Sequence, residues 1–214
     1  MKTLNRTLLF LAVLSSIVLV AFKNEEHVTI KLGDTIPKVD TPMKGTDGNE
    51  YTLEKIGKEK GTLVIFSCNT CPFVVGRGDK TEGWQKRYNG IQQLCDELKV
   101  GMVLVNSNEA KRDDEDSYEA MIKFEKEKQQ KSIYVVDKNS IVADAFGAKT
   151  TPHVFLFDSN RKLIYKGAID DSVDSPEKVT KHYLKDALKQ HAEGKKIKIS
   201  ESKALGCSIK RVKH

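Results

Sequence analysis

Short apolar runs separated by polar segments are the dominant pattern of this chain, and they predict β-strands. Five runs of four to six residues fit the description: residues 62–66, 101–105, 133–136, 153–157 and 163–168. The first three are almost entirely apolar, which is typical of strands buried inside a sheet. The last two flank a polar turn at residues 158–161, so we expect them to pair as an antiparallel hairpin.

Apolar residues at three- and four-residue spacing predict helices between these strands. In residues 79–98 this stripe consists of Trp84, Tyr88, Ile91, Leu94, Cys95 and Leu98. Further helices are predicted at residues 117–130, 140–146 and 179–191, and two short extended pieces at residues 38–43 and 50–53. This order of elements predicts an α/β fold, a three-layer sandwich with a central mixed β-sheet flanked by helices.

The first 22 residues differ in pattern from the rest of the chain. Lys2 and Arg6 precede residues 8–22, which contain no charged side chain. A basic start followed by an apolar stretch is typical of a secretory signal peptide. The stretch is short for a membrane-spanning helix, which needs roughly 20 apolar residues. We therefore predict an exported, periplasmic or cell-envelope protein, either released or held at the membrane through residues 1–22.

Composition and charge divide the remaining chain into three parts. With 39% apolar and 31% charged residues among 214, the chain suits one globular domain with a real core. We predict a linker at residues 23–31, the domain at residues 32–193 and a basic tail at residues 194–214. The leader contributes +2 and the tail +6 to a net charge of +6, so the central segment carries −2. The basic character belongs to the ends, and nucleic-acid binding is not expected of an exported chain.

The most informative chemical feature is the C-x-x-C motif of Cys68 and Cys71, directly behind the predicted strand at residues 62–66. Two cysteines delivered by a strand to the start of a helix are typical of a dithiol redox centre. Pro72 fits the first turn of such a helix. We expect Cys68 to be the exposed thiol at the helix N-terminus, where backbone N–H groups stabilise a thiolate. Half of a structural zinc site is the alternative, but no second C-x-x-C or histidine pair follows.

The other two cysteines call for separate interpretations. Cys95 falls within the apolar stripe of the helix at residues 79–98, which favours a buried structural thiol. Cys207 lies in the polar tail, where packing does not readily explain a thiol. It is a passive residue of a solvated tail, a third redox thiol that folds back, or a thiol that pairs with another chain. If it folds back, the contacts that hold it come from the tail itself, where Ile209 and Val212 would dock on the domain and hold Cys207 near Cys68.

Thr151-Pro152 stands at the start of the fourth strand, a position where a proline is tolerated and where a cis bond has a modest cost. At this point the sequence resembles the thioredoxin superfamily, and more closely its peroxiredoxin-like redoxin branch. The matching motifs are Gly33-Asp34-x-Ile36-Pro37, Cys68-Asn69-Thr70-Cys71-Pro72, Asn106-Ser107-Asn108, Phe146-Gly147-Ala148, Tyr165-x-Gly167-x-x-Asp170-Asp171-Ser172 and Gly206-Cys207-Ser208-Ile209-Lys210.

This resemblance implies a thioredoxin-like sandwich in which a cis-proline loop packs against the C-x-x-C motif. It further implies that Cys68 and Cys71 are catalytic and that Thr151 and Pro152 offer backbone to a bound substrate. No cofactor is implied. The expected partners are protein thiols or disulfides and an upstream thiol donor, and His153 and Cys207 are candidate accessory residues.

Two departures from the family pattern bear on the reaction. Thr70 stands where relatives often have histidine between the cysteines, and Ile65 stands where a peroxidatic site has threonine. The sequence therefore favours an exported thiol–disulfide oxidoreductase. A thiol-dependent peroxidase and a copper-binding or other soft-metal protein using Cys68, Cys71 and His153 stay as alternatives, as does a binding module with an incidental disulfide.

Overall fold

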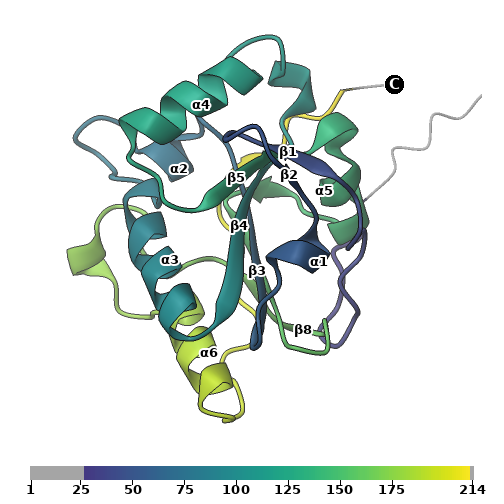
Figure 1. The fold of residues 1–214 in the computed structure, drawn as a ribbon. Coiled ribbons are helices and arrows are strands. Elements are labelled where there is room, and N and C mark those ends of the chain that lie inside the picture. The colour runs from purple at the N-terminus through teal and green to yellow at the C-terminus, as the bar shows by residue number, and fades with distance from the viewer. Residues whose placement is uncertain (1–26, 213–214) are drawn as a thin grey trace, which may run out of the picture.

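A seven-stranded mixed β-sheet forms the centre of the structure, a computed structural model that describes residues 27–212 (Figure 1). Its strand order is β2-β1-β5-β4-β3-β7-β8. The strands are β1 (Met43–Gly45), β2 (Glu50–Tyr51), β3 (Gly61–Ser67), β4 (Val100–Asn106), β5 (Ile133–Val136), β7 (His153–Phe157) and β8 (Leu163–Gly167). Strands β3, β4 and β5 are parallel, whereas β7 and β8 form the predicted antiparallel hairpin beside β3.

Helices cover both faces of this sheet, which confirms the predicted α/β sandwich. They are α1 (Leu53–Ile56), α2 (Pro72–Val75), α3 (Tyr88–Glu97), α4 (Tyr118–Glu127), α5 (Ile141–Phe146) and α6 (Tyr183–Ala192). Helices α3 and α6 lie on one side of the sheet and α1 and α5 on the other (Figure 1). A second, two-stranded sheet pairs β6 (Thr150–Thr151) with β9 (Cys207–Ser208).

The alternation of side chains along β3 builds a separate core on each face. Leu63 and Ile65 pack with α3, α4 and α6, whereas Val64 and Phe66 pack with α1 and α5. All seven residues of β3 are buried, as expected of a strand at the centre of a covered sheet. Cys95 belongs to the first core and is completely buried, which confirms its predicted structural position.

The prediction of a helix at residues 79–98 is wrong about where the helix begins. A loop occupies its first part, a 3₁₀ turn spans Gln85–Arg87, and α3 begins only at Tyr88. Trp84 is still buried, but its indole N–H donates to the Asp170 carboxylate at 2.8 Å. Gly83 lies so close to the backbone of α2 that a Cβ atom would be 2.3 Å from the Val74 carbonyl oxygen. These tertiary contacts hold the segment outside the helix.

Further boundaries also differ from the prediction. The extended piece predicted at residues 38–43 is a turn at residues 38–40, and β1 begins only at Met43. The last helix begins at Tyr183 rather than at residue 179, because the Asp171 carboxylate accepts hydrogen bonds from the backbone N–H groups of Thr180 and Lys181. The extended piece at residues 50–53 ends early, since Thr52 caps α1 by accepting from the Lys55 N–H. In the latter two places a side-chain oxygen accepts hydrogen bonds from backbone N–H groups, and these bonds determine where the helix starts.

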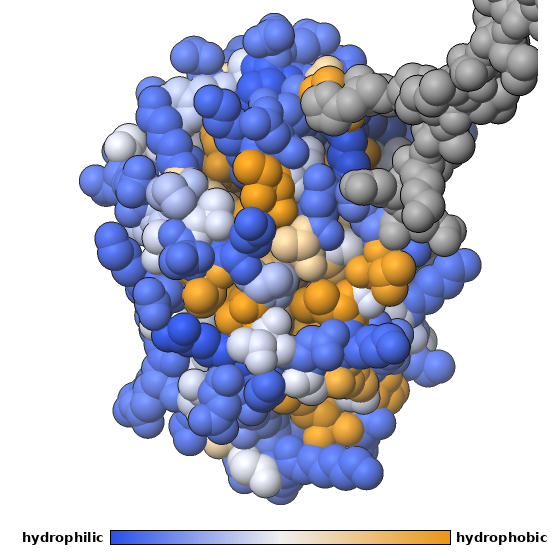
Figure 2. Space-filling view, turned by 90° about the vertical axis from the view of Figure 1, so that its right-hand side faces the viewer, coloured by the Kyte–Doolittle hydropathy of each residue, from blue (hydrophilic) through white to orange (hydrophobic). Residues whose placement is uncertain are grey.

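Both flanking segments contact the domain where the structure describes them. Residues 28–30 of the predicted linker lie against the end of α5, where the Ile30 N–H donates to the Phe146 carbonyl. The predicted leader at residues 1–22 lies outside the described residues and stays a prediction. Within residues 27–212 no helix has the length and apolar character needed to cross a membrane. On the face seen in Figure 2, apolar residues are interspersed with hydrophilic ones.

A close backbone approach at Gly101 in β4 gives a test of this packing. A Cβ atom at this position would lie 1.9 Å from the Ile56 carbonyl oxygen of α1. We expect Gly101→Ala to lower the free energy of unfolding by about 1–3 kcal/mol, because α1 must shift away from the sheet. Urea unfolding followed by circular dichroism measures the change.

The matched control is Gly90→Ala in α3, where a Cβ atom meets nothing within 4 Å. This substitution should instead stabilise the protein by about 0.5–1 kcal/mol, because alanine favours a helix interior. Equal effects of the two substitutions would contradict the packing described for β4 and α1.

Candidate active site

The two cysteines of the C-x-x-C motif lie at the carboxyl end of β3, between the sheet and α2. Cys68 follows the last residue of β3, and α2 begins at Pro72, so Cys71 is the N-cap residue. Both are free thiols, and their side chains are almost fully buried, at 1% exposure for Cys68 and 4% for Cys71. The expectation that Cys68 is the exposed thiol at the helix start is therefore wrong. The helix begins four residues later than the first cysteine.

The loop before β7 lies directly against both sulfur atoms. The Thr151–Pro152 peptide bond is cis, as predicted. Thr151 Oγ1 is 3.2 Å from Cys68 Sγ, and the Thr151 carbonyl oxygen is 3.1 Å from Cys71 Sγ. The structure thus brings four predicted site residues, two cysteines and the Thr151–Pro152 pair, to one place.

The cysteines differ in their ionisation. A hydrogen bond from the Cys68 thiol, followed by hydrogen bonds from Cys207, lowers the pKa of Cys71 to about 5. The same hydrogen bond to Cys71, together with burial and the negative charge of Asp116, raises the pKa of Cys68 well above its usual value. This arrangement favours ionisation of Cys71 over ionisation of Cys68.

A buried carboxylate organises the loop between the cysteines. Asp116 is completely buried and accepts three hydrogen bonds, from the Asn69 N–H at 2.9 Å and from the side-chain amides of Asn106 and Asn108 at 2.8 Å each. The Tyr134 hydroxyl donates to the Asn69 side-chain oxygen at 2.9 Å. Since a buried charge requires such partners, this network fixes the C-x-x-C loop against the end of β4.

The sequence analysis missed Asp116 as a site residue. Asp116 lies in the polar segment at residues 106–116, which follows β4 at the same sheet edge as the cysteines. Among several acidic residues in that segment, only Asp116 is buried. Side-chain periodicity carries no signal in an irregular loop, so the sequence offered no means of choosing it.

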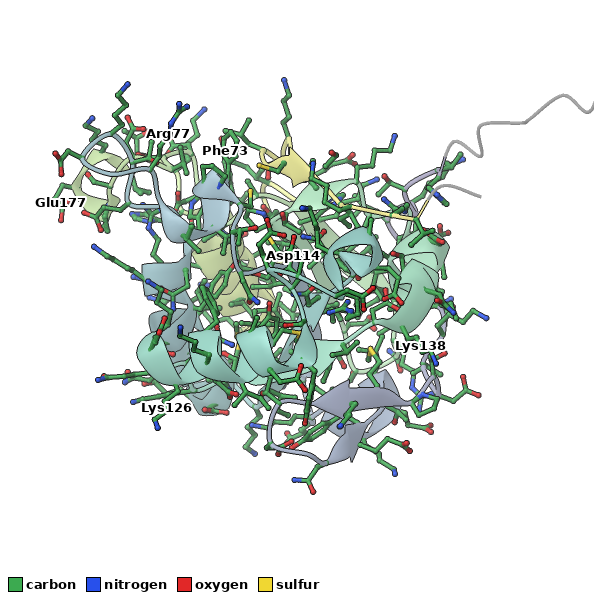
Figure 3. All side chains as sticks on the ribbon, turned by 90° about the horizontal axis from the view of Figure 1, so that it is seen from above. Phe73, Arg77, Asp114, Lys126, Lys138 and Glu177 are labelled. Atoms are coloured by element: carbon green, nitrogen blue, oxygen red, sulfur yellow. The ribbon has the colours of Figure 1, made fainter. Side chains whose placement is uncertain are left out.

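The C-terminal segment is the third part of the site. Strand β9 pairs antiparallel with β6, and Cys207 lies opposite Thr151 in the register. The Cys207 N–H donates to Cys71 Sγ at 3.4 Å. Seen from above, this segment, yellow in Figure 3, passes beside the helix that carries Phe73. The interpretation of a solvated tail is therefore wrong for residues 200–211. Ile209 is buried as predicted, whereas Val212 is exposed.

A small cavity of about 190 Å³ opens beside the thiols. Its lining includes Cys68, Cys71, Thr151, Cys207, Lys111 and Lys210. The two lysines place positive charge at a site that holds a thiolate. The space is suited to a short side chain or a disulfide rather than to a large cofactor.

His153 lies apart from the cysteines. Its Nδ1 accepts from the Lys149 N–H at 3.2 Å, and its ring lines a different cavity, with Lys166. Burial, together with the charges of Lys166 and Lys149, lowers the pKa of His153 to about 4. Among residues 27–212 no group of three histidine, cysteine or acidic side chains is arranged to hold a metal ion. His153 is therefore not placed to bind a soft metal together with Cys68 and Cys71.

Comparison with known proteins identifies the family. A model of the Redoxin family matches residues 31–184. The chain belongs to the Redoxin family. The family supports a thiol-based redox enzyme in general and leaves open the choice between disulfide exchange and peroxide reduction. No curated protein matches this chain.

Two solved structures are similar to this chain over most of its length. An uncharacterised conserved protein from Geobacillus kaustophilus is 32% identical, with a TM-score of 0.74, and the alignment covers 84% of this chain and 92% of that one. A hypothetical protein from Sinorhizobium meliloti 1021 is 28% identical, with a TM-score of 0.75, over 86% of this chain and 97% of that one.

A more distant structure shows the fold alone. A provisionally assigned thiol:disulfide interchange protein, DsbE, from Chlorobium tepidum is 19% identical, with a TM-score of 0.52, over 78% of this chain and 98% of that one. The predicted thioredoxin-like sandwich is thereby confirmed for this redoxin-family chain.

The buried carboxylate gives a test of the site. In Asp116→Asn one acceptor becomes a donor that faces other donors, so we expect a loss of about 1–3 kcal/mol in the free energy of unfolding. Removing the negative charge should also lower the pKa of Cys68, which Asp116 raises. Urea unfolding and the thiolate ultraviolet absorbance of a Cys71→Ser background measure the two effects.

The matched control is Asp114→Asn in the same loop, which is exposed and pairs only with Lys111. This substitution should change neither the free energy of unfolding nor the pKa of Cys68 measurably. A Cys68 pKa that moves equally in both variants would contradict the assigned role of Asp116.

Proposed function

We propose that this redoxin-family protein is a thiol–disulfide oxidoreductase that uses Cys68 and Cys71 as its redox-active dithiol. The observation that carries the proposal is the contact of both sulfur atoms with Thr151, beside a cavity that reaches them. Disulfide exchange needs one cysteine that ionises readily and a second thiol close enough to resolve the mixed disulfide. The loop residues Thr151 and Pro152 supply a backbone edge at the same place.

The reaction conserves atoms and electrons between protein and substrate. The thiolate of the dithiol attacks one sulfur of a substrate disulfide, forming a mixed disulfide and releasing the other substrate sulfur as a thiolate. The second cysteine loses its proton to that thiolate and attacks the mixed disulfide. The products are a Cys68–Cys71 disulfide and a substrate dithiol, and an upstream thiol donor returns the protein to the dithiol.

Substrate recognition would use main-chain pairing. The β6 backbone at Thr150 and Thr151 already pairs with an extended segment of this chain. An extended substrate segment can make the same hydrogen bonds, because strand addition needs no particular side chains. Lys111 and Lys210 beside the cavity favour a substrate without positive charge next to its disulfide.

The environment of Cys68 favours disulfide exchange over peroxide reduction. Ile65, three residues before Cys68, is a buried apolar residue of β3 and offers no hydroxyl to a peroxide. Arg112 donates to the carbonyl oxygens of Asn106 and Asp116, so these contacts direct its guanidinium into the loop. A peroxidase would need donors that polarise the peroxide oxygen–oxygen bond.

We propose that the protein works after export, in the cell envelope. The support is the basic and apolar pattern of residues 1–22. Disulfide exchange also suits an oxidising compartment, where substrate disulfides persist. Residues 1–22 either are removed or keep the domain near the membrane.

Serine substitutions test the dithiol. We expect Cys71→Ser to reduce catalytic disulfide exchange to the uncatalysed background and Cys68→Ser to lower it strongly, because the closing Cys68–Cys71 disulfide needs both sulfur atoms. Reduction of a dithiol-linked insulin or fluorescent disulfide substrate measures the rate, with hydrogen peroxide consumption measured in parallel.

Cys95→Ala is the control, since burial raises the pKa of Cys95 to about 12 and places it in the core. Its exchange rate should match that of the unaltered protein. Full activity of Cys71→Ser, or peroxide turnover exceeding disulfide exchange, would overturn the proposed function.

The stabilised thiolate also predicts the redox poise. A pKa of about 5 for Cys71 stabilises the dithiol form relative to the disulfide. We therefore expect a reduction potential above that of thioredoxin, roughly −270 mV. Equilibration with glutathione redox buffers measures it. A potential at or below the thioredoxin value would contradict the assignment of a stable thiolate.

A further inference from the structure

The C-terminal segment occupies the edge at which a substrate strand would pair. Strand β9 runs antiparallel to β6, with Thr151 opposite Cys207 and Thr150 opposite Ser208. The Ile209 N–H extends this pairing by donating to the Lys149 carbonyl oxygen at 3.0 Å. The chain's own tail therefore makes the contacts that strand addition would offer to a substrate.

Several features hold this segment in one position. A Cβ atom on Gly206 would lie 2.2 Å from the Thr151 carbonyl oxygen, so the close approach depends on a glycine there. Ile209 is buried in the core beneath α5. The Lys210 N–H donates to the Asn108 side-chain oxygen at 2.9 Å, and Arg211 donates to the Asp144 carboxylate at 2.6 Å.

Docking places a third sulfur atom against the dithiol. The Cys207 N–H donates to Cys71 Sγ, and the Cys207 thiol also hydrogen-bonds to Cys71. Cys207 is partly exposed, whereas Cys68 and Cys71 are almost completely buried. With the tail docked, Cys207 is thus the sulfur of the three-thiol cluster of Cys68, Cys71 and Cys207 that an external thiol reaches first.

We propose that Cys207 is a third redox-active residue, which takes over the disulfide from the buried pair as a Cys71–Cys207 bond. The proposal rests on the proposed function, because disulfide exchange with substrate supplies the initial Cys68–Cys71 disulfide. The Cys207 thiolate attacks the Cys71 sulfur, the Cys71–Cys207 bond forms, and the Cys68–Cys71 bond breaks. Cys68 leaves as a thiolate and takes up the proton that Cys207 lost, so the protein's oxidation state is unchanged.

Reduction then proceeds from the surface. An external donor thiol attacks Cys207, forms a mixed disulfide with it and releases Cys71 as the thiolate. A second donor thiol resolves this mixed disulfide, which leaves three protein thiols and a donor disulfide. The low pKa of Cys71 makes it a good leaving group for this step. Substrate and donor would thus use the site in turn, the substrate with the tail displaced and the donor with the tail docked.

Disulfide mapping of the full chain tests the proposal. The reduced protein is oxidised with a stoichiometric amount of oxidised glutathione, quenched with acid, alkylated, digested and analysed by mass spectrometry. We expect a Cys71–Cys207 peptide pair in the unaltered protein and, in Cys68→Ser, this pair as the principal disulfide. In Cys207→Ser, reduction of the oxidised protein by glutathione should be slower.

The matched control moves the thiol by one residue. The double variant Cys207→Ser/Ser208→Cys has the same composition, but the thiol points to the opposite side of the strand. The yield of a link to Cys71 should fall by roughly tenfold or more, because the displaced thiol loses its effective concentration at the site. An equal yield would mean that an undocked tail forms the bond by chance.

The outcomes separate this proposal from the proposed function. If Cys71→Ser keeps full exchange activity, the dithiol function itself is wrong. If Cys71→Ser is inactive and Cys68→Ser is strongly impaired, but no Cys71–Cys207 link forms and Cys207→Ser is reduced at an unchanged rate, only the third-thiol proposal is overturned. Cys95 should remain unlinked in every variant and serves as the internal control for disulfide scrambling.

Discussion

The parallel pairing of β3 with β4 is the interaction on which the site depends. It runs in unbroken register from Gly61 opposite Val100 to Ser67 opposite Asn106. Because both strands end together, the loop that carries the cysteines and the loop that begins at Asn106 leave the sheet at one edge. On the other side of β3, the antiparallel register of β7 places His153 opposite Phe66 and so delivers the Thr151–Pro152 loop to the same edge.

Three loops from distant parts of the chain therefore meet at a point set by strand register alone. A shift of one residue would turn every side chain of β3 to the opposite face. The two cores make such a shift very costly, because all seven residues of β3 are buried between helices. The dithiol therefore follows directly on β3, the strand whose register is most strongly specified.

The buried carboxylate of Asp116 links this support to the thiols and to the tail. It binds Asn69 between the cysteines, and it binds Asn108, whose side-chain oxygen accepts from the Lys210 N–H. A charge in the protein interior is tolerated because each neighbouring donor is aimed at it. With the hydrogen bond to Cys71 and burial, the same charge raises the pKa of Cys68, so the network affects the ionisation of the pair as well as its position.

The docked tail also protects an edge. An unpaired backbone edge such as β6 invites pairing with other chains, and covering it is a common solution in β-proteins. Here the cover is short and rests on one buried apolar residue, Ile209, with a few hydrogen bonds. Burial of such a side chain contributes about 1.5–3 kcal/mol, and each hydrogen bond about 1 kcal/mol. Attachment of this strength, opposed by the entropy of closing the loop, suits a cover that a substrate can displace.

The sequence by itself determined the elements whose signal is local. Apolar runs marked strands β3, β4, β5, β7 and β8, and the C-x-x-C motif behind residues 62–66 marked the dithiol. The position of Pro152 placed the Thr151–Pro152 loop at the start of the hairpin. These predictions succeeded because strand alternation, turn preference and cysteine spacing are properties of neighbouring residues.

Only the tertiary structure decided features that depend on distant partners. The start of α3 moved to Tyr88, because Trp84 hydrogen-bonds to Asp170 in another loop. Cys68 is buried rather than exposed, because Thr151 and Cys207 pack onto the pair from positions far along the chain. Hydrogen bonds from Cys68 and from Cys207 lower the pKa of Cys71. Asp116 became a site residue through donors that strand register brought to it. Burial and charge pairing arise from contacts across the fold, and a single sequence does not encode them locally.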